Sequence, residues 1–441
     1  MNWTLLQRKF SARLFKTDQK YDWWLILIVS TLALGGIAFL ASASSVFSTA
    51  RYGSELYLLA KQASLGLWIG FAAAFILSRT DYHKLYHLRL PLLVLSFVLL
   101  GWLALSEILF KFNIIDSPGD FRIGTMGPLD VNFATRWLVL FPGFSFQPVE
   151  ITKFALLIYI SSFFLERERQ RPEEQQPITI LTLKKHLYAL GASMILIILQ
   201  PDLGSALLVF GVCFGSLFIA KTPTKILVTI IAGVMIFATL SILPSVNNDG
   251  TNTNYRYTRF VGFLKNISGE ADNTLAVNYH TNRVEDAISN GGLWGEGYGN
   301  SYYKKRGLIP EAHTDAIIGV IGEEMGFIRT ALFLGLYLAL AIRGLRTARR
   351  APDLFGRSLS AGIVFWISGQ ALLNLMSFLE LTPASGVPLP FVSYGSTSLL
   401  INLAIMGILI NISSHGVEPE ERPSRVNSIS LTPKKYSLRK A

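Results

Sequence analysis

Charged side chains are scarce in this sequence of 441 residues, and cysteine is almost absent. Lys, Arg, Asp and Glu make up 16% of the chain, against about 25% in ordinary soluble domains. The one cysteine, Cys213, cannot form an intramolecular disulfide and lies within an apolar run, where a small buried thiol is ordinary. These shortages exclude a disulfide-stapled domain and a disordered chain.

Long apolar runs take the place of the missing charge. Hydrophobic residues make up 51% of the chain, and most of the runs are long enough to cross a bilayer. The sequence therefore predicts an all-α polytopic membrane protein with ten transmembrane helices. We expect the spans at about 22–43, 57–78, 90–110, 149–165, 186–201, 203–220, 226–244, 314–342, 358–379 and 391–413.

The basic residues predict the orientation of these spans. The segments on the side of the two termini carry 26 Lys and Arg, whereas the short segments on the opposite side carry 4. Because positive charge is retained on the cytoplasmic side, both termini are expected in the cytoplasm. The net charge of +11 thus reflects topology, and no nucleic-acid partner is expected.

Three regions are expected along the chain. Residues 1–21 form a cytoplasmic basic segment, residues 22–413 the membrane domain, and residues 414–441 a basic, disordered cytoplasmic tail. The outer loop at 245–313, between spans seven and eight, is too long to be structureless, so we expect it to be partly folded and functional.

Charges inside or beside the apolar runs are candidate functional residues, since each costs roughly 2.5–3.5 kcal/mol at mid-bilayer. Glu150 and Lys153 share one helix face, so the simpler interpretation is an ion pair between them. In the alternative interpretation, Lys153 is a cation that binds an anionic substrate. Asp202 precedes a span and suits an N-cap. Glu323 and Glu324 need partners or water, which Arg329 could supply.

The stretch PEAHTD concentrates polar residues at the outer end of span eight. Pro310 suits a helix start, so His313 and Asp315 are expected in the first turns of that helix. Helical spacing would allow Asp315 and Glu323, but not Glu324, to share one polar cavity. The competing interpretation of these acids is helix capping and compensation of the helix dipole.

Cofactor signals are weak. The sequence has no H-E-x-x-H pattern and no cysteine pair, so a transition-metal site is not expected, whereas oxygen-bound magnesium stays open. The glycine-rich run NGGLWGEGYGNS lacks the strand–turn–helix context of a nucleotide-binding fold. It indicates a tight outer loop instead.

Four segments taken together resemble the SEDS family (shape, elongation, division and sporulation), over about residues 22–413. They are RW…FQPVEITK (Arg136 to Lys153), QPDLGSALLV (Gln200 to Val209), GGLWGEGYGNS…PEAHTD…GEEMG (Gly291 to Gly326) and GVPLPFVSYGSTSLL (Gly386 to Leu400). The resemblance implies a bacterial glycosyltransferase that polymerises lipid II into peptidoglycan strands at the outer face of the bacterial inner membrane.

The resemblance also assigns roles. Asp315 matches the family's essential aspartate and would act as general base, while candidates for contacting the substrate and its diphosphate are Arg136, Glu150, Lys153, Arg259, Lys304 and His313. Residues expected to shape the cavity are Asp202, Glu323, Glu324, Pro388, Pro390 and Ser393. The implied partners are lipid II, the growing glycan strand, a class B penicillin-binding protein and other division or elongation proteins.

Subtype and activity have alternatives. Ala312 before the His favours a division-type member, enriched at the septum, over an elongation-type member, which often has Arg there. The sequence departs from the family at Ala316, Ile318 and Ser396, which weakens the subtype assignment. A lipid II flippase and a docking scaffold are the rival functions, although the motif residues gather at the outer face, which favours chemistry there.

Overall fold

The computed structural model describes residues 21–112, 114, 136–141, 144–170, 177–200, 202–220, 222–242, 255–268, 276–379, 381–383 and 385–416. Its elements are α2 (Trp23–Tyr52), α3 (Tyr57–Lys61), the π-helix η1 (Gln62–Trp68), α4 (Ile69–Arg79), the 3₁₀-helix η2 (Tyr82–Leu88), α5 (Arg89–Lys111), β1 (Leu138–Phe141), β2 (Phe144–Phe146), α6 (Pro148–Arg169), α7 (Ile180–Leu199), α8 (Leu203–Ile219), α9 (Thr224–Ile242), α10 (Tyr255–Ile267), α11 (Ala276–Gly291), α12 (Tyr302–Lys305), α13 (Ile317–Arg350), α14 (Leu354–Phe378) and α15 (Ser396–Ser414).

Membrane-spanning helices dominate the structure, as the apolar runs predict. In the described ranges, nine helical stretches are long and apolar enough to cross a bilayer, and α8 is a shorter apolar helix. At 1.5 Å per residue, the 17 residues of α8 extend about 26 Å, less than the roughly 30 Å of the hydrocarbon core. The expected polytopic all-α class is confirmed. Nine of the ten expected spans correspond to helices long enough to cross a bilayer in the described residues, whereas the span expected at 203–220 corresponds to the shorter helix α8, so the count of ten stays a prediction.

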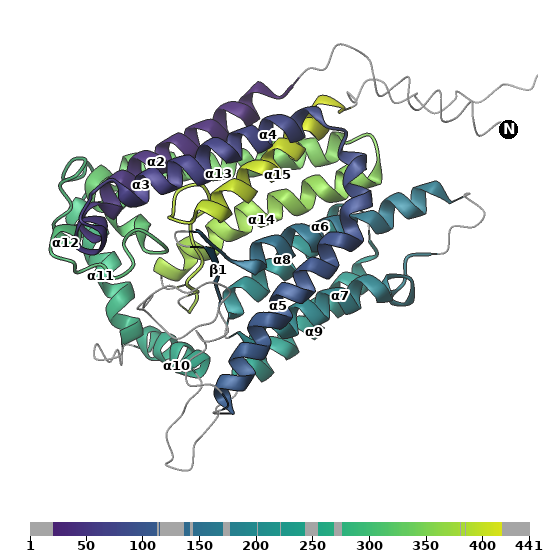
Figure 1. Ribbon diagram of the computed structural model, residues 1–441, viewed down its shortest axis with the longest axis horizontal. Coiled ribbons are helices and arrows are strands. Elements are labelled where there is room, and N and C mark those ends of the chain that lie inside the picture. The colour runs from purple at the N-terminus through teal and green to yellow at the C-terminus, as the bar shows by residue number, and fades with distance from the viewer. Residues whose placement is uncertain are drawn as a thin grey trace, which may run out of the picture.

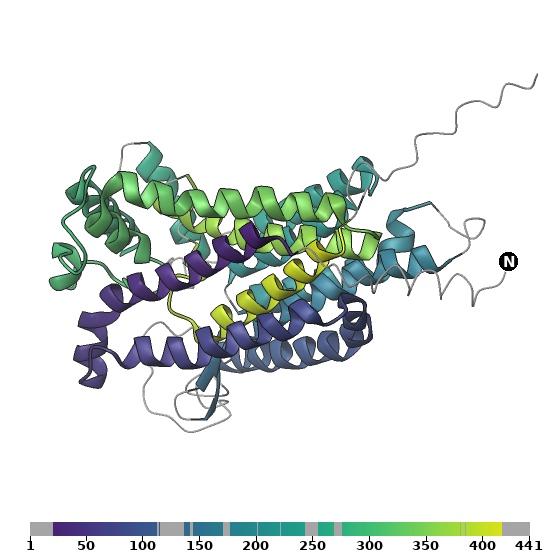
Figure 2. The ribbon, with the colours of Figure 1, turned by 90° about the horizontal axis from the view of Figure 1, so that it is seen from above.

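The long helices lie side by side along the longest axis of the molecule (Figures 1 and 2). One apolar cluster joins α2, α13, α14 and α15, and a second joins α5 to α9. Helix α14 packs against α6, α8, α13 and α15, with Trp366 fully buried. Helix α14 therefore borders both apolar clusters.

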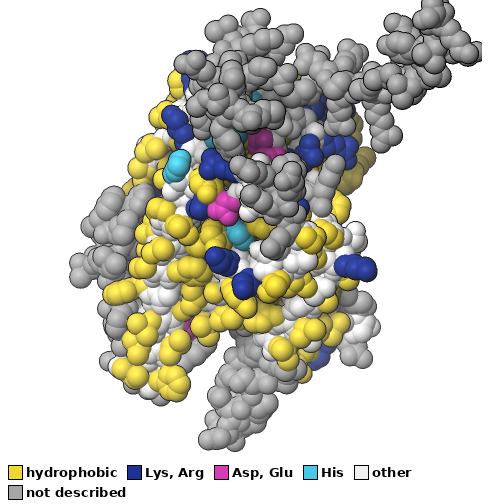
Figure 3. Space-filling view, turned by 90° about the vertical axis from the view of Figure 1, so that its right-hand side faces the viewer, with side chains coloured by type: hydrophobic (Ala, Val, Ile, Leu, Met, Phe, Trp, Pro, Cys, Tyr) yellow, Lys and Arg dark blue, Asp and Glu magenta, His cyan; other side chains and the backbone are white. Residues whose placement is uncertain are grey.

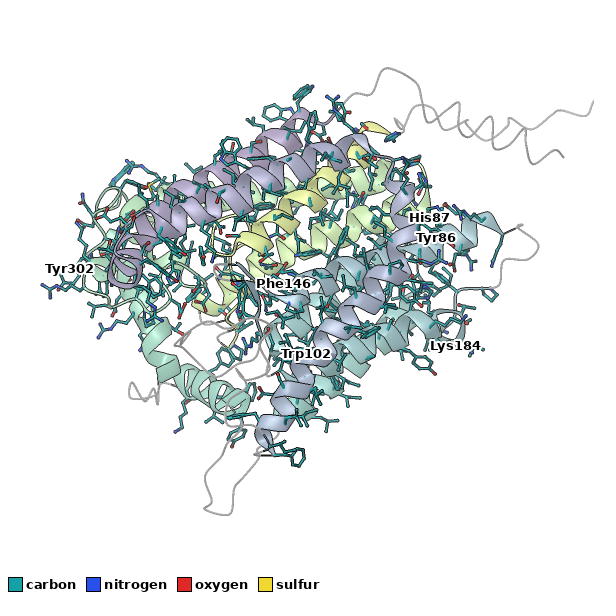
Figure 4. The ribbon with its side chains drawn as sticks, viewed as in Figure 1. Tyr86, His87, Trp102, Phe146, Lys184 and Tyr302 are labelled. Carbon is teal, nitrogen blue, oxygen red and sulfur yellow. The ribbon has the colours of Figure 1, made fainter. Side chains whose placement is uncertain are left out.

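The two ends of the bundle differ. Figure 4 places Tyr86, His87 and Lys184 at one end and Tyr302 at the other. Figure 3 looks onto the first of these ends, where Lys and Arg side chains gather. Segments predicted to share a side of the membrane thus lie at the same end of the molecule.

The region between spans seven and eight contains helices α10, α11 and α12, which confirms that the outer loop is partly folded. A small antiparallel hairpin of β1 and β2 precedes α6, with Leu138 opposite Phe146. Figure 4 shows Phe146 in the middle of the molecule, where this hairpin leads into α6. The expected terminal segments fall largely outside the described residues, which begin at Tyr21 and end at Gly416.

At the Lys- and Arg-rich end, Asp353 caps α14. Its Oδ1 accepts from the Gly356 N–H at 2.6 Å, its Oδ2 accepts from the Tyr82 hydroxyl, and His83 Nε2 lies 3.4 Å from Oδ2. Burial alone would raise the pKa of Asp353, but the contacts from His83, Tyr82 and Gly356 outweigh it and hold this pKa below 3.8. The carboxylate therefore stabilises the fold in its ionised form.

Replacing Asp353 tests this cap and its charge separately. Asp353→Ala is expected to cost about 0.5–2 kcal/mol at pH 7, because the cap is lost, whereas Asp353→Asn keeps a good cap and loses only the charge. Since the folded pKa lies below the unfolded one, the advantage of wild type over Asp353→Asn is present above pH 3.8 and disappears as pH falls through the folded pKa. Thermal unfolding of wild type and Asp353→Asn at several pH values measures this difference in stability. A difference that did not change with pH would show that the charge of Asp353 is not its source.

Candidate active site

Asp315 lies in a turn just before α13, and this corrects the expected helix start. The helix begins at Ile317 rather than near Pro310, because Glu311 adopts a positive φ of 52° and the Thr314 N–H closes a turn onto the Glu311 carbonyl at 2.9 Å. The Thr314 hydroxyl also donates to Glu311 Oε2 at 2.8 Å. Asp315 is thus carried by non-helical backbone, which must be held in place by other elements.

Two contacts outside the turn hold this backbone. Asn374 of α14 donates its side-chain amide to the Asp315 carbonyl at 3.0 Å, and the Tyr394 N–H donates to the His313 carbonyl at 2.8 Å. The His313 ring stacks on Phe47 with centroids 4.3 Å apart. Burial lowers the pKa of His313, against an opposing effect of Glu311, so the ring is neutral at pH 7.

The proline-rich segment from Gly386 to Gly395 lies beside this turn and is held by side chains of three helices. Its Val387 and Pro388 carbonyls accept from the amides of Asn374 and Gln370, at 2.8 and 2.9 Å. Further on, the Pro390 carbonyl accepts from the Tyr337 hydroxyl of α13, the Ser393 hydroxyl from the Leu389 N–H, and the Ser393 carbonyl from Gln62 of η1. The segment is therefore ordered although it is not helical.

Glu150 and Lys153 form the ion pair that the sequence predicts. Lys153 Nζ lies 2.9 Å from Glu150 Oε1, and the side chains of Lys153 and Glu150 are 1% and 5% exposed. The ammonium also donates to Gln370 Oε1 at 3.1 Å and sits 4.5 Å from the centre of the Trp366 ring. Within the described residues, Glu150 Oε2 accepts no hydrogen bond.

Asp202 is the N-cap of α8, as expected. Its Oδ1 accepts from the Ser205 N–H at 3.0 Å, and its Oδ2 lies 3.9 Å from Arg136 Nε. A Cβ added to Gly204 would meet the side chain of Val387 at 2.8 Å, so this helix start packs directly against the proline-rich segment. Three of the four motif segments, together with the Asp315 turn of the remaining one, therefore converge at one place.

Lys304, Glu323 and Glu324 form a separate buried cluster. Lys304 Nζ lies 2.7 Å from Glu324 Oε1 and donates to the Ser42 hydroxyl of α2 at 2.6 Å. The carboxylate of Glu323 instead accepts from Asn290 at 2.9 Å and from the Tyr302 N–H at 3.0 Å.

This cluster corrects two expectations. Arg329 is not the partner of the glutamates, because its Nη1 donates to the Trp294 carbonyl. The hydrogen bonds described for the Glu323 carboxylate come instead from Asn290 at the end of α11 and from Ser301 and Tyr302 at the start of α12, and not from the turn of Asp315. Helix α13 breaks at Gly326 (φ 75°), where a Cβ would meet the Gly295 nitrogen at 2.3 Å, so the cluster fastens the glycine-rich loop to this break.

The remaining predicted residues are placed as follows. Arg259 lies in α10, but its side chain is outside the described part of the structure. Ala316 and Ile318, two of the departures from the family pattern, are buried in the apolar cluster of α13. The third, Ser396, begins α15 and donates to Gln62 Oε1 at 3.3 Å.

A metal would need ligands near Asp315. In the described ranges of the chain, no group of three or more His, Cys, Asp or Glu side chains gathers into a potential metal site. Magnesium often binds through one or two carboxylates together with substrate phosphates, so a magnesium ion stays a prediction.

The amide side chains of this site were not predicted from the sequence. Gln370 and Asn374 stand four residues apart in the apolar run ISGQALLNLMSF, so they share one helix face. Buried amides need partners, and a pair of them on one face of a membrane helix was the available signal. Gln62 gives a similar signal in span two.

Comparison of the chain with known proteins agrees with this architecture. A model of the cell cycle protein family named for FtsW, RodA and SpoVE matches residues 22–418. The chain is 32% identical over 399 residues to a probable peptidoglycan glycosyltransferase FtsW of Geobacter metallireducens, covering 90% of this chain and 96% of the relative. It is 33% identical to the protein of that name in Trichlorobacter lovleyi, over 90% of this chain and 93% of the relative.

Solved structures share the fold. A chain of a peptidoglycan synthase complex that coordinates polymerization and crosslinking superposes with a TM-score of 0.64 at 24% identity, covering 89% of this chain and 97% of that one. The rod shape determining protein RodA of Thermus thermophilus superposes with a TM-score of 0.58 at 24% identity, covering 90% and 98%. With its motifs, its helices and its FtsW-named relatives in agreement, the chain belongs to the FtsW, RodA and SpoVE family of cell cycle proteins, the SEDS family that its four segments resemble.

Proposed function

We propose that this protein is a peptidoglycan glycosyltransferase that polymerises lipid II at the outer face of the bacterial inner membrane, with both termini in the cytoplasm. The supporting observation is the convergence of the Asp315 turn, the proline-rich segment and the buried Lys153 on α14. Polar groups from motifs far apart in the sequence thus surround one face of α14, which is the arrangement expected of a single site. The FtsW-named relatives support a role in septal wall synthesis during division.

Asp315 is the proposed general base. Its carboxylate takes the proton from the 4-hydroxyl of the acceptor sugar as that oxygen attacks the anomeric carbon of the donor. The new bond joins this oxygen to the anomeric carbon, the bond from that carbon to the lipid diphosphate breaks, and the configuration inverts. General-base assistance contributes typically about 10²–10⁴-fold, and positioning of the two lipid-anchored substrates supplies much of the rest.

Positive charge is needed where the diphosphate leaves. Arg136, whose side chain is 24% exposed and lies 3.9 Å from Asp202, is the proposed contact with phosphate oxygens through its guanidinium fork. Lys153 acts from a buried position, where Glu150 and Gln370 orient it. Lys304 is already occupied by Glu324, so we assign it to the architecture of the loop rather than to the diphosphate.

The proposed partner is a class B penicillin-binding protein, because the chain carries no motif suited to peptide crosslinking. The structurally similar synthase complex couples polymerization to crosslinking, which supports such a pairing here. Other division proteins would bring the pair to the septum.

Polymerisation of labelled lipid II by the purified protein with its partner tests the proposed activity. We expect long glycan strands, resolved by electrophoresis and removed by a muramidase, and an EDTA arm decides whether magnesium is needed. Lipid II crossing vesicle bilayers without strand formation would favour the flippase instead. Depletion in cells separates the subtypes: filaments indicate division, and rounding indicates elongation.

A further inference from the structure

Two buried amides on α14 link the reacting groups of the proposed site to one short stretch of backbone. Gln370 and Asn374 are each 1% exposed and stand one helical turn apart. Both donate to the proline-rich segment, to the carbonyls of the adjacent residues Pro388 and Val387.

Asn374 is the link to the proposed base. Its Nδ2 donates to the Asp315 carbonyl at 3.0 Å and to the Val387 carbonyl at 2.8 Å. Both carbonyls can only accept, so the orientation of the amide is fixed, with Nδ2 toward them and Oδ1 away. Within the described residues Oδ1 has no partner. Rotating the amide by 180° would place Oδ1 against the two carbonyls and break both hydrogen bonds.

Gln370 is the corresponding link to the buried cation. Its Nε2 donates to the Pro388 carbonyl at 2.9 Å, and its Oε1 accepts from Lys153 Nζ at 3.1 Å. One helix face therefore fixes the turn of Asp315 and the ammonium of Lys153 against two successive carbonyls.

We propose that Asn374 and Gln370 are positioning residues of the glycosyl transfer, setting where Asp315 and Lys153 stand relative to each other. This inference rests on the proposed function. Asp315 is carried by a turn rather than a helix, so its backbone depends on such ties more than a helical residue would. A displacement of about 1 Å in a reacting group can cost about 100-fold in rate.

Asn411 provides a matched control. It is also a buried amide, 2% exposed, its Nδ2 donates to the Ser78 carbonyl at 2.7 Å, and its Oδ1 likewise has no partner among the described residues. It differs from Asn374 in two ways: it donates to one described carbonyl rather than two, and that carbonyl belongs to Ser78 near the end of α4, in a part of the chain without motif residues.

The test compares Asn374→Leu, Gln370→Met and Asn411→Leu with wild type in the lipid II polymerisation assay, with thermal unfolding measured alongside. For Asn374→Leu and Gln370→Met we expect kcat to fall about 10–100-fold, with KM changed by less than about threefold. Asn411→Leu should also lose stability, by no more than Asn374→Leu because it removes one bond rather than two, and should keep kcat within about twofold of wild type. A merely structural amide would lower the amount of folded protein without this split.

Several results would overturn the inference. An active wild type with Asn374→Leu at the same kcat, or an equal loss of kcat in Asn411→Leu, refutes positioning and leaves the proposed function intact. A wild type that forms no strands refutes the proposed function and the inference with it. Should Asn374→Leu not fold, Asn374→Ser carries the test: it keeps one donor, so an intermediate kcat supports positioning and an unchanged kcat refutes it.

Discussion

Asp315→Asn is expected to lower strand formation from lipid II by about 10²–10⁴-fold, because the amide has nearly the shape of the carboxylate but cannot accept the proton of the attacking hydroxyl. The backbone ties of the turn run to carbonyl and N–H groups, so they do not depend on the side chain. The variant should therefore fold, bind its partner and bind lipid II. Single-turnover polymerisation, normalised to folded protein, is the measurement.

Glu311→Gln is the control for this change. Glu311 is an exposed acid in the same turn, and its described side-chain contact is the hydroxyl of Thr314. It should retain nearly full activity, which separates loss of the base from loss of negative charge in the turn. Equal strand formation by Asp315→Asn and wild type would move the base elsewhere, with Glu150 the next acid to test.

Lys304→Met is expected to destabilise the protein by about 3–5 kcal/mol, because it leaves the Glu324 carboxylate buried without a counter-charge. The pair is 4% and 1% exposed, and its Nζ to Oε1 distance is 2.7 Å. The double variant Lys304→Met/Glu324→Gln removes both charges and should recover much of this loss. The yield of folded protein and the thermal unfolding midpoint measure both effects.

The adjacent Lys305 serves as the control. It is exposed and donates to Asn300 at 3.3 Å, so Lys305→Met should change stability by no more than about 0.5 kcal/mol. If Lys304→Met were equally mild, the cluster would not be what fastens the glycine-rich loop to the break at Gly326.

Much of this protein is determined by its sequence alone. The apolar helices follow from runs of hydrophobic residues, because a chain in lipid must satisfy its backbone hydrogen bonds within each span. The Asp202 cap and the Glu150–Lys153 pair were also predictable, since both join residues three apart in the chain. The meeting of the four motif segments could be expected only through the resemblance to a family.

The tertiary structure alone decided which charges work together. Lys304 pairs with Glu324, 20 residues away, and with Ser42, 262 residues away. Arg329 is nearer to Glu324 in the sequence and was its expected partner, but it donates to a loop carbonyl. Asn374 reaches the turn of Asp315 across 59 residues. Helical spacing predicts partners only within about one turn; beyond that, the packing of one helix on another selects them, because a buried polar group bonds to whatever the neighbouring helix presents.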